Sequence, residues 1–206
     1  MYAHILLDEM DEDHEDIRDD LKLIVDQADR CKKIVSGLLQ FARQNKTVRL
    51  ETNVAEMVEE ALRSVQSPEG VEVVTEFEMD NPVAMIDRDQ IIQVLVNLIS
   101  NAYAAMDGRG TLTARASDKP DAIVLQISDT GCGIPEETMK KIFEPFYTTK
   151  QLGQGTGLGL SVSYGIVKMH SGDISVASNT DPEKGPTGTT FTVALPRGND
   201  LEKGNE

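Results

Sequence analysis

The segment DRDQIIQVLVNLISNAYAAM, at residues 87–106, decides how the rest of the chain is interpreted. Its apolar residues recur at steps of three and four, which predicts an amphipathic helix with one buried face. Asn97 and Asn101 are four residues apart, so their side-chain amides project from one helical face. An amide oxygen can ligate a hard cation such as Mg²⁺ without adding negative charge beside an anionic ligand. Taken alone, the two residues are more simply interpreted as surface asparagines. Other motifs must therefore decide whether they bind a metal ion.

Two glycine-rich segments follow the predicted helix. The first, DTGCGIP at residues 129–135, comes directly after an alternating apolar segment that predicts a buried strand. The second, GQGTGLGL at residues 153–160, comes just before a segment with helical spacing. Backbone N–H groups and the helix dipole favour phosphate groups at such a helix start. The second segment alone is weak evidence, because a flexible loop could have the same composition.

In this order, the paired asparagines and the two glycine segments resemble the N, G1 and G2 boxes of the GHKL ATPase superfamily. That superfamily includes gyrase, a heat-shock chaperone ATPase and histidine kinases. Between the glycine segments, KIFEPFYTTK at residues 141–150 resembles the F box of sensor histidine kinases, which separates these kinases from their relatives. The resemblance extends over nearly the whole chain. It implies an α+β fold, the two-layer α/β sandwich known as the GHKL or Bergerat fold, over residues 48–196.

The apolar patterns within residues 48–196 agree with a sandwich that carries its helices on one face of a mixed sheet. Asn53 and Asp87 are the predicted caps of two of these helices. Residues 197–206 are predicted to form a disordered tail. The predicted strands span residues 48–52, 71–77, 83–86, 111–117, 122–128, 173–178 and 189–195, and the predicted helices span residues 54–65, 87–106, 136–142 and 158–170.

Residues 1–44 are predicted to form a helical hairpin. Apolar residues recur at alternating steps of four and three from Ile17 to Ala42, which is the spacing of a helix in a coiled coil or bundle. The hairpin resembles the dimerisation and phosphoacceptor domain of histidine kinases, with LLQFAR at residues 38–43 matching the end of its second helix. Neither His4 nor His14 lies in the H box of that family. We therefore expect a homodimer through the hairpin and an acceptor histidine upstream of residue 1.

Asp129 is the predicted recognition group for adenine. A carboxylate at the end of a buried strand can accept a hydrogen bond from the exocyclic amine of adenine, which guanine cannot supply. Gly131 and Gly133 are expected to take positive φ angles and to let the backbone approach the base. Lys150 could meet the γ-phosphate as a point charge, although a solvated surface lysine is an equal alternative. The predicted nucleotide-binding residues are Asn97, Asn101, Asp129, Gly131, Gly133, Ile134, Lys150, Gly155, Thr156, Gly157, Leu158, Gly159 and Thr189, with Asn101 as the metal ligand and Asn97, Asn101 and Lys150 as catalytic residues.

Two of the other polar residues have competing interpretations. Thr189 resembles the threonine that lies near adenine in the family, but it could equally be an ordinary strand threonine. His170 follows a predicted helix that ends at Ser171 and Gly172, where an imidazole often satisfies terminal carbonyl groups. A structural role is therefore expected for His170.

The composition excludes several classes of protein. The net charge of −15 argues against nucleic-acid binding, because phosphate backbones recruit Lys and Arg. Cys31 and Cys132 lie far apart and show no metal-binding spacing, which indicates reduced thiols in the cytoplasm. No apolar run approaches the ~20 residues that span a bilayer. We expect a cytoplasmic fragment without membrane contact, although a larger parent protein could be anchored.

The resemblance implies the ATP-binding catalytic portion of a two-component sensor histidine kinase. Such a protein-histidine kinase transfers the γ-phosphoryl group of ATP, bound with Mg²⁺, to a histidine for relay to the receiver domain of a response regulator. Asn97 stands where the hydrolysing relatives carry a water-activating glutamate, which favours a kinase, since a neutral imidazole needs less help from a base. The alternatives are a GHKL serine kinase or ATPase and a nucleotide-binding dimer module without activity.

Overall fold

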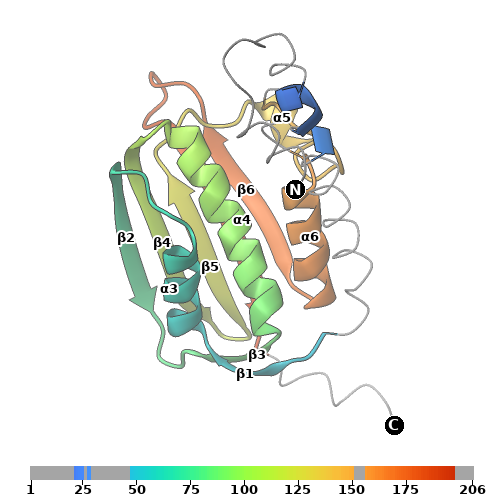
Figure 1. Ribbon diagram of the computed structural model, residues 1–206. Coiled ribbons are helices and arrows are strands. Elements are labelled where there is room, and N and C mark those ends of the chain that lie inside the picture. Colours follow the sequence, from blue (N-terminus) through green and yellow to red (C-terminus); the bar gives the residue numbers. More distant parts are fainter. Residues whose placement is uncertain (1–20, 26, 29–46, 151–155, 198–206) are drawn as a thin grey trace.

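A computed structural model describes residues 21–25, 27–28, 47–150 and 156–197 of the chain. Its centre is a five-stranded sheet, and the three longest helices of these residues cover one face of it (Figure 1). The elements are β1 (Leu50–Asn53), α3 (Val54–Ser64), β2 (Gly70–Glu78), β3 (Val83–Ile86), α4 (Arg88–Met106), β4 (Arg109–Lys119), β5 (Ala122–Asp129), α5 (Glu136–Met139), α6 (Gly159–Met169), β6 (Asp173–Asn179) and β7 (Gly188–Pro196).

The strands of the large sheet run in the order β2-β4-β5-β7-β6. β2 and β4 are parallel, whereas β4, β5, β7 and β6 pair antiparallel in succession. β4 and β5 are joined by a two-residue turn at Pro120 and Asp121, with Lys119 opposite Ala122. β1 and β3 form a separate antiparallel pair at one end of the helical layer (Figure 1). The predicted two-layer sandwich with a mixed sheet is therefore confirmed.

Helix α4 lies across the middle of the sheet and forms the centre of the core (Figure 1). Its buried face includes Ile91, Leu95, Leu98 and Ile99, each at most 1% exposed. Burial of one such side chain contributes about 1.5–3 kcal/mol to folding. Asp87 caps the helix, because its carboxylate accepts a hydrogen bond from the Gln90 N–H. The helix predicted from residues 87–106 is confirmed at both ends.

Several predicted bounds differ from the structure. The helix predicted at residues 136–142 ends at Met139, and turns with bonds from Lys141 N–H to Thr138 O (2.9 Å) replace it. The bonds from Lys141 N–H to Thr138 O and from Glu144 N–H to Lys141 O span three residues, so the chain tightens into successive turns after Met139. The predicted strand at residues 48–52 is β1, which begins only at Leu50.

Arg197 was predicted to be the first residue of a disordered tail, but hydrogen bonds and an ion pair hold it against the folded domain. Its guanidinium pairs with Asp118 and donates to Val83 O (3.2 Å), and its backbone N–H donates to Asp121 O (3.2 Å). A charge pair joining β4 to the end of β7 could not be inferred from composition. The rest of the predicted tail, residues 198–206, lies outside the described residues.

Most of the predicted hairpin also lies outside the described residues, and residues 21–25 and 27–28 are helical where they are described. Both His4 and His14 lie outside them as well. Across the portion of the chain that the structure covers, no helix combines the length and apolar character needed to cross a bilayer.

Candidate functional site

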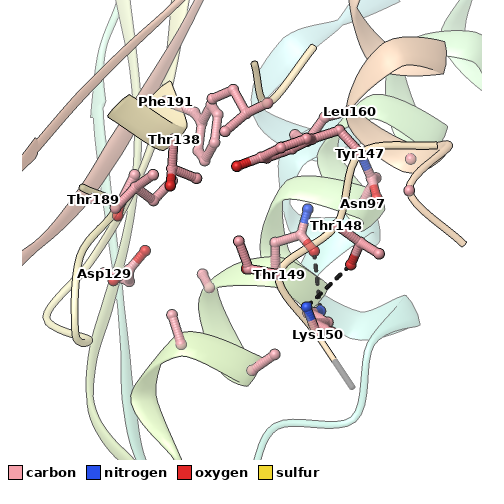
Figure 2. Close-up of a pocket in the computed structure, with 18 of the residues that line it drawn as sticks. Asn97, Asp129, Thr138, Tyr147, Thr148, Thr149, Lys150, Leu160, Thr189 and Phe191 are labelled. Carbon is pink, nitrogen blue, oxygen red and sulfur yellow. Dashed lines mark hydrogen bonds between the residues drawn. The ribbon is translucent and has the colours of Figure 1, made fainter. Parts of the chain in front are cut away.

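A cavity of about 550 Å³ opens between α4, the end of β5, α5 and the start of α6. Asp129 and Thr189 lie on one side of it, and Asn97 and Lys150 lie on the other (Figure 2). Most of the predicted site residues line this cavity together. They are Asn97, Asn101, Asp129, Gly133, Ile134, Lys150, Thr156, Gly157, Gly159 and Thr189.

Two of the predicted site residues that the structure describes, Leu158 and Gly131, do not line the cavity. Gly155 lies outside the described residues. Leu158 is buried at 8% exposure directly before α6, and its backbone N–H donates to the Thr156 hydroxyl (3.3 Å). Gly131 packs against the end of α4, because a side chain there would lie 2.6 Å from the carbonyl oxygen of Ala105. Leu158 and Gly131 thus pack against residues that line the cavity.

The carboxylate of Asp129 is almost buried at the end of β5, with 9% exposure. One of its oxygens accepts a hydrogen bond from the Gly131 N–H (2.8 Å). Burial raises the pKa of this carboxyl, and backbone hydrogen bonds from Gly131 and Thr189 oppose the rise. Such a buried acceptor facing a cavity can recognise an N–H donor on a ligand.

Only one of the two glycines predicted to take a positive φ in this turn does so. Gly133 has φ +75°, and a Cβ there would lie 2.2 Å from the Asn179 carbonyl oxygen. Gly131 does not adopt a positive φ, so that expectation was wrong. The need for glycine at residue 131 comes from the close approach of α4, which the sequence motif did not reveal.

The hydroxyl of Ser178 connects the turn after β5 to β7. Its Oγ accepts from the Ile134 N–H (2.7 Å), donates to Gly188 O (2.8 Å) and lies 2.9 Å from Thr189 Oγ1. Ser178 pairs directly with Thr189 in the β6–β7 register. These bonds hold Ile134 and Thr189 beside Asp129 at one end of the cavity.

The amides of Asn97 and Asn101 both line the cavity, but different partners hold them. The Asn97 Nδ2 donates to the Ser163 hydroxyl (2.9 Å) on α6. The Asn101 Oδ1 accepts from the Lys150 Nζ (3.3 Å). Lys150 therefore already lies at the end of the cavity that the paired amides form.

The two ends of the segment between Phe146 and Gly157 are joined by their backbones. The Phe146 N–H donates to Gly157 O (2.9 Å), and both residues have φ +67°. A Cβ on Gly157 would lie 2.4 Å from the Phe146 carbonyl carbon, so glycine is required there. The Phe146 ring is 57% exposed, whereas Phe143 packs against Tyr164 with a centroid distance of 5.5 Å.

The donor set limits how a metal could be held. Among the residues that the structure describes, no group of three or more His, Cys, Asp or Glu side chains could form a metal site. Mg²⁺ commonly keeps waters and binds through few protein oxygens together with phosphate oxygens of a substrate. Two neutral amide oxygens beside a cavity fit that mode of binding.

His170 lies at the opposite end of α6 and is 2% exposed. Its Nδ1–H donates to Ile166 O (2.9 Å), and its Nε2 accepts from the Asp87 N–H (3.1 Å). Burial lowers the pKa of this imidazole, and the bond that Nε2 accepts from the Asp87 N–H requires the neutral ring. The structural role predicted for His170 is confirmed, and its bond to Asp87 adds a link to α4.

A family model described as "Histidine kinase-, DNA gyrase B-, and HSP90-like ATPase" matches residues 86–199, which is more than half of the chain. The chain belongs to this ATPase family. The match begins two residues before α4 and includes every residue that lines the cavity, from Asn97 to Phe191.

Within this family, the chain is similar to sensor kinases. It is 39% identical over 183 residues to the signal transduction histidine-protein kinase AtoS of Escherichia coli, with 85% of the chain and 28% of that protein covered. It is 37% identical to the sensor kinase CckA of Brucella abortus, with 86% of the chain and 20% of that protein covered. The chain thus corresponds to about a quarter of these curated relatives.

A solved mycobacterial sensor histidine kinase, MprB, has the same fold as this member of the ATPase family. The TM-score is 0.64 at 26% identity, over 72% of this chain and 97% of the solved one. The fold is therefore shared with a solved sensor histidine kinase.

Sequence reasoning missed several residues of this site. Thr138, Tyr147 and Phe191 line the cavity, and Ser163 and Ser178 hold other residues in place. The sequence pattern placed residue 178 in a strand and residue 163 in a helix. Neither pattern predicts which residue of another element each side chain contacts.

Proposed function

We propose that this chain is the ATP-binding catalytic portion of a sensor histidine kinase, which transfers the γ-phosphoryl group of ATP to a histidine side chain. The observation that carries the proposal is the cavity itself, in which a buried carboxylate lies across from two helical amides and a lysine. The similarity to AtoS and CckA, both named as kinases, supports it.

Asp129 would recognise the adenine base. Its carboxylate has one oxygen bound to the Gly131 N–H, and the group lines the cavity. Accepting a hydrogen bond from the exocyclic amine would select adenine over guanine, whose carbonyl at that place would face the carboxylate. Thr189, held by Ser178, lies beside it.

Asn97, Asn101 and Lys150 would bind the phosphate end of the nucleotide. The amide oxygens of Asn97 and Asn101 would hold Mg²⁺, which supplies neutralisation of the charge on the phosphate oxygens when it is bound. Lys150 would add a positive charge at the same end, starting from its present contact with Asn101. Gly157 and Gly159 would let the start of α6 approach the phosphates.

The acid–base chemistry of the cavity favours transfer to an imidazole over hydrolysis. Among the described residues that line it, Asp129 is the one carboxylate, and it lies across the cavity from Asn97. A water molecule needs a base to become a nucleophile, whereas a neutral imidazole does not. The proposal also includes an acceptor histidine, relay of the phosphoryl group to the receiver domain of a response regulator, a homodimer and a cytoplasmic location.

The decisive experiment supplies γ-labelled ATP, Mg²⁺ and a separate protein fragment that carries an H box. We expect label on the acceptor that is lost in acid and retained in base, as for phosphohistidine. Label that survives acid would indicate a serine kinase, and release of free phosphate without an acceptor would indicate an ATPase. Failure of the folded chain to bind ATP with Mg²⁺ would contradict all three activities.

A further inference from the structure

Ser163 is a buried polar residue in the middle of α6, with 1% exposure. Buried hydroxyl groups need a hydrogen-bond partner, and the Ser163 Oγ finds it in the Asn97 Nδ2 at 2.9 Å. Ser163 is not among the residues that line the cavity. Any effect of its hydroxyl on a ligand must therefore pass through Asn97.

Gly159 leaves space for the oxygen atom of the same amide. A Cβ at Gly159 would lie 2.2 Å from the Asn97 Oδ1, so the absence of a side chain makes room for that oxygen. Gly159 itself lines the cavity. One turn of α6 thus binds the Asn97 amide nitrogen through a hydroxyl and leaves its oxygen beside the cavity.

The two amides differ in how firmly their oxygens are positioned. The Asn101 oxygen is bound by Lys150, whose long side chain is flexible. The Asn97 amide is bound by a short, buried hydroxyl on a packed helix. A residue that hydrogen-bonds to a metal-binding side chain can orient that side chain before the metal binds. This lowers the entropy cost of ordering the side chain on binding.

From these contacts we propose that Ser163 is a positioning residue, which orients the Asn97 amide oxygen for the binding of ATP together with Mg²⁺. The inference rests on the proposed function of the cavity. It assigns a specific task to a residue that touches neither nucleotide nor metal.

The test measures the dissociation constant of ATP for the full chain, once with Mg²⁺ and once with EDTA. For Ser163→Ala we expect the affinity for ATP with Mg²⁺ to fall about tenfold, which is typical when a residue that hydrogen-bonds to a metal-binding side chain is removed. Affinity in EDTA should change less than about twofold, because Asn97 acts through the metal. Ser163→Thr keeps the hydroxyl and should restore most of the affinity.

Ser161→Ala is the matched control. Ser161 lies on the same helix, and its hydroxyl donates to Leu158 O (2.9 Å) rather than to Asn97. Its affinities with Mg²⁺ and in EDTA should match those of the wild type. Should Ser163→Ala fail to fold, Ser163→Cys keeps the volume of the side chain with a much weaker hydrogen bond and takes its place.

A double-mutant cycle separates positioning from a general structural effect. If Ser163 acts through Asn97, Asn97→Ala combined with Ser163→Ala should bind no more weakly than Asn97→Ala alone. Additive losses, equal losses with and without Mg²⁺, or an unchanged Ser163→Ala variant would each overturn the inference. Absence of ATP binding by the wild-type chain would instead overturn the proposed function.

Discussion

The two ends of the α4–α6 pair differ in how they use their polar groups. At the end next to β1, Asp87 and His170 bind each other, and the Asp87 carboxylate also accepts from the Val48 N–H (3.0 Å). At the other end, the Asn97 and Asn101 amides line an open cavity. We call the first end, made by Val48, Arg49, Asp87 and His170, the junction.

The difference teaches where stability and binding reside in this helix pair. At the junction, backbone and side-chain groups satisfy one another, including the Arg49 guanidinium, which donates to Met169 O (3.1 Å). At the cavity, side chains keep atoms available for a ligand. Substitutions at the junction should therefore lower the free energy of unfolding, and substitutions at the cavity should lower affinity.

The largest effect is expected for His170→Ala. It removes a buried ring and leaves the Asp87 N–H without its acceptor, whereas the Ile166 carbonyl group keeps its bond from the backbone N–H of residue 170 (3.2 Å). The loss of packing and of this acceptor should cost about 3–4 kcal/mol of stability. Urea denaturation measures this loss. Below the unfolding transition, ATP affinity should stay within about threefold of the wild type, and a selective loss of affinity without loss of stability would break the comparison.

The opposite pattern is expected for Asp129→Asn. The amide still accepts from the Gly131 N–H, so stability should change little, but its NH₂ group would face the adenine amine. We expect ATP affinity to fall about 100-fold, or ~2.7 kcal/mol. Titration calorimetry measures it, with Asp80→Asn as the control, since Asp80 is exposed and does not line the cavity. Near-normal affinity would remove the adenine role.

The junction should also make stability depend on pH. Burial lowers the folded-state pKa of His170 below its ordinary 6.5, with Arg49 opposing and Asp87 favouring the charged form. The unfolded chain therefore binds the proton first, so this contribution is full above pH 6.5 and is lost as pH falls toward the folded pKa. The slope should reach at most about 1.4 kcal/mol per pH unit. Urea midpoints from pH 7 to 5 should show this slope, and its persistence in His170→Ala would assign it to other groups.

The smallest effect is expected for Arg49→Ala. It removes one hydrogen bond to Met169 O at a partly buried position, which should cost about 1 kcal/mol of stability. Arg63→Ala, which breaks an exposed pair with Glu59, is the control and should cost about 0.5 kcal/mol or less. If the two variants are equally stable, Arg49 contributes nothing to the junction beyond surface charge.

Much of the fold could be predicted because its signals are local. Helix α4 has a period of three to four and a capping aspartate, and β7 alternates buried and half-buried residues along its whole length. The convergence of Asn97, Asn101 and Asp129 followed from four ordered motifs. The helix and strand signals are local, whereas the motif order extends over residues 97–160 and depends on the family resemblance.

What could not be predicted depends on contacts between distant elements. Ser163 reaches Asn97 across 66 positions, and Ser178 reaches Ile134 across 44 positions. Gly131 was expected to need an unusual φ, but its requirement comes from Ala105 on a neighbouring helix. Neither propensity nor periodicity specifies which residues meet when two elements pack, so these supporting residues appear only in the fold.

The turn between β4 and β5 has a practical consequence. Pro120 and Asp121 lie at one end of β5, and Asp129 lies at the other, which separates them by roughly 23 Å along the strand. A biotin attached through the thiol of a Pro120→Cys variant, with Cys31 and the exposed Cys132 replaced by serine, would tether the protein with its cavity directed away from a sensor surface. Nucleotide capture could then be followed on an immobilised chain.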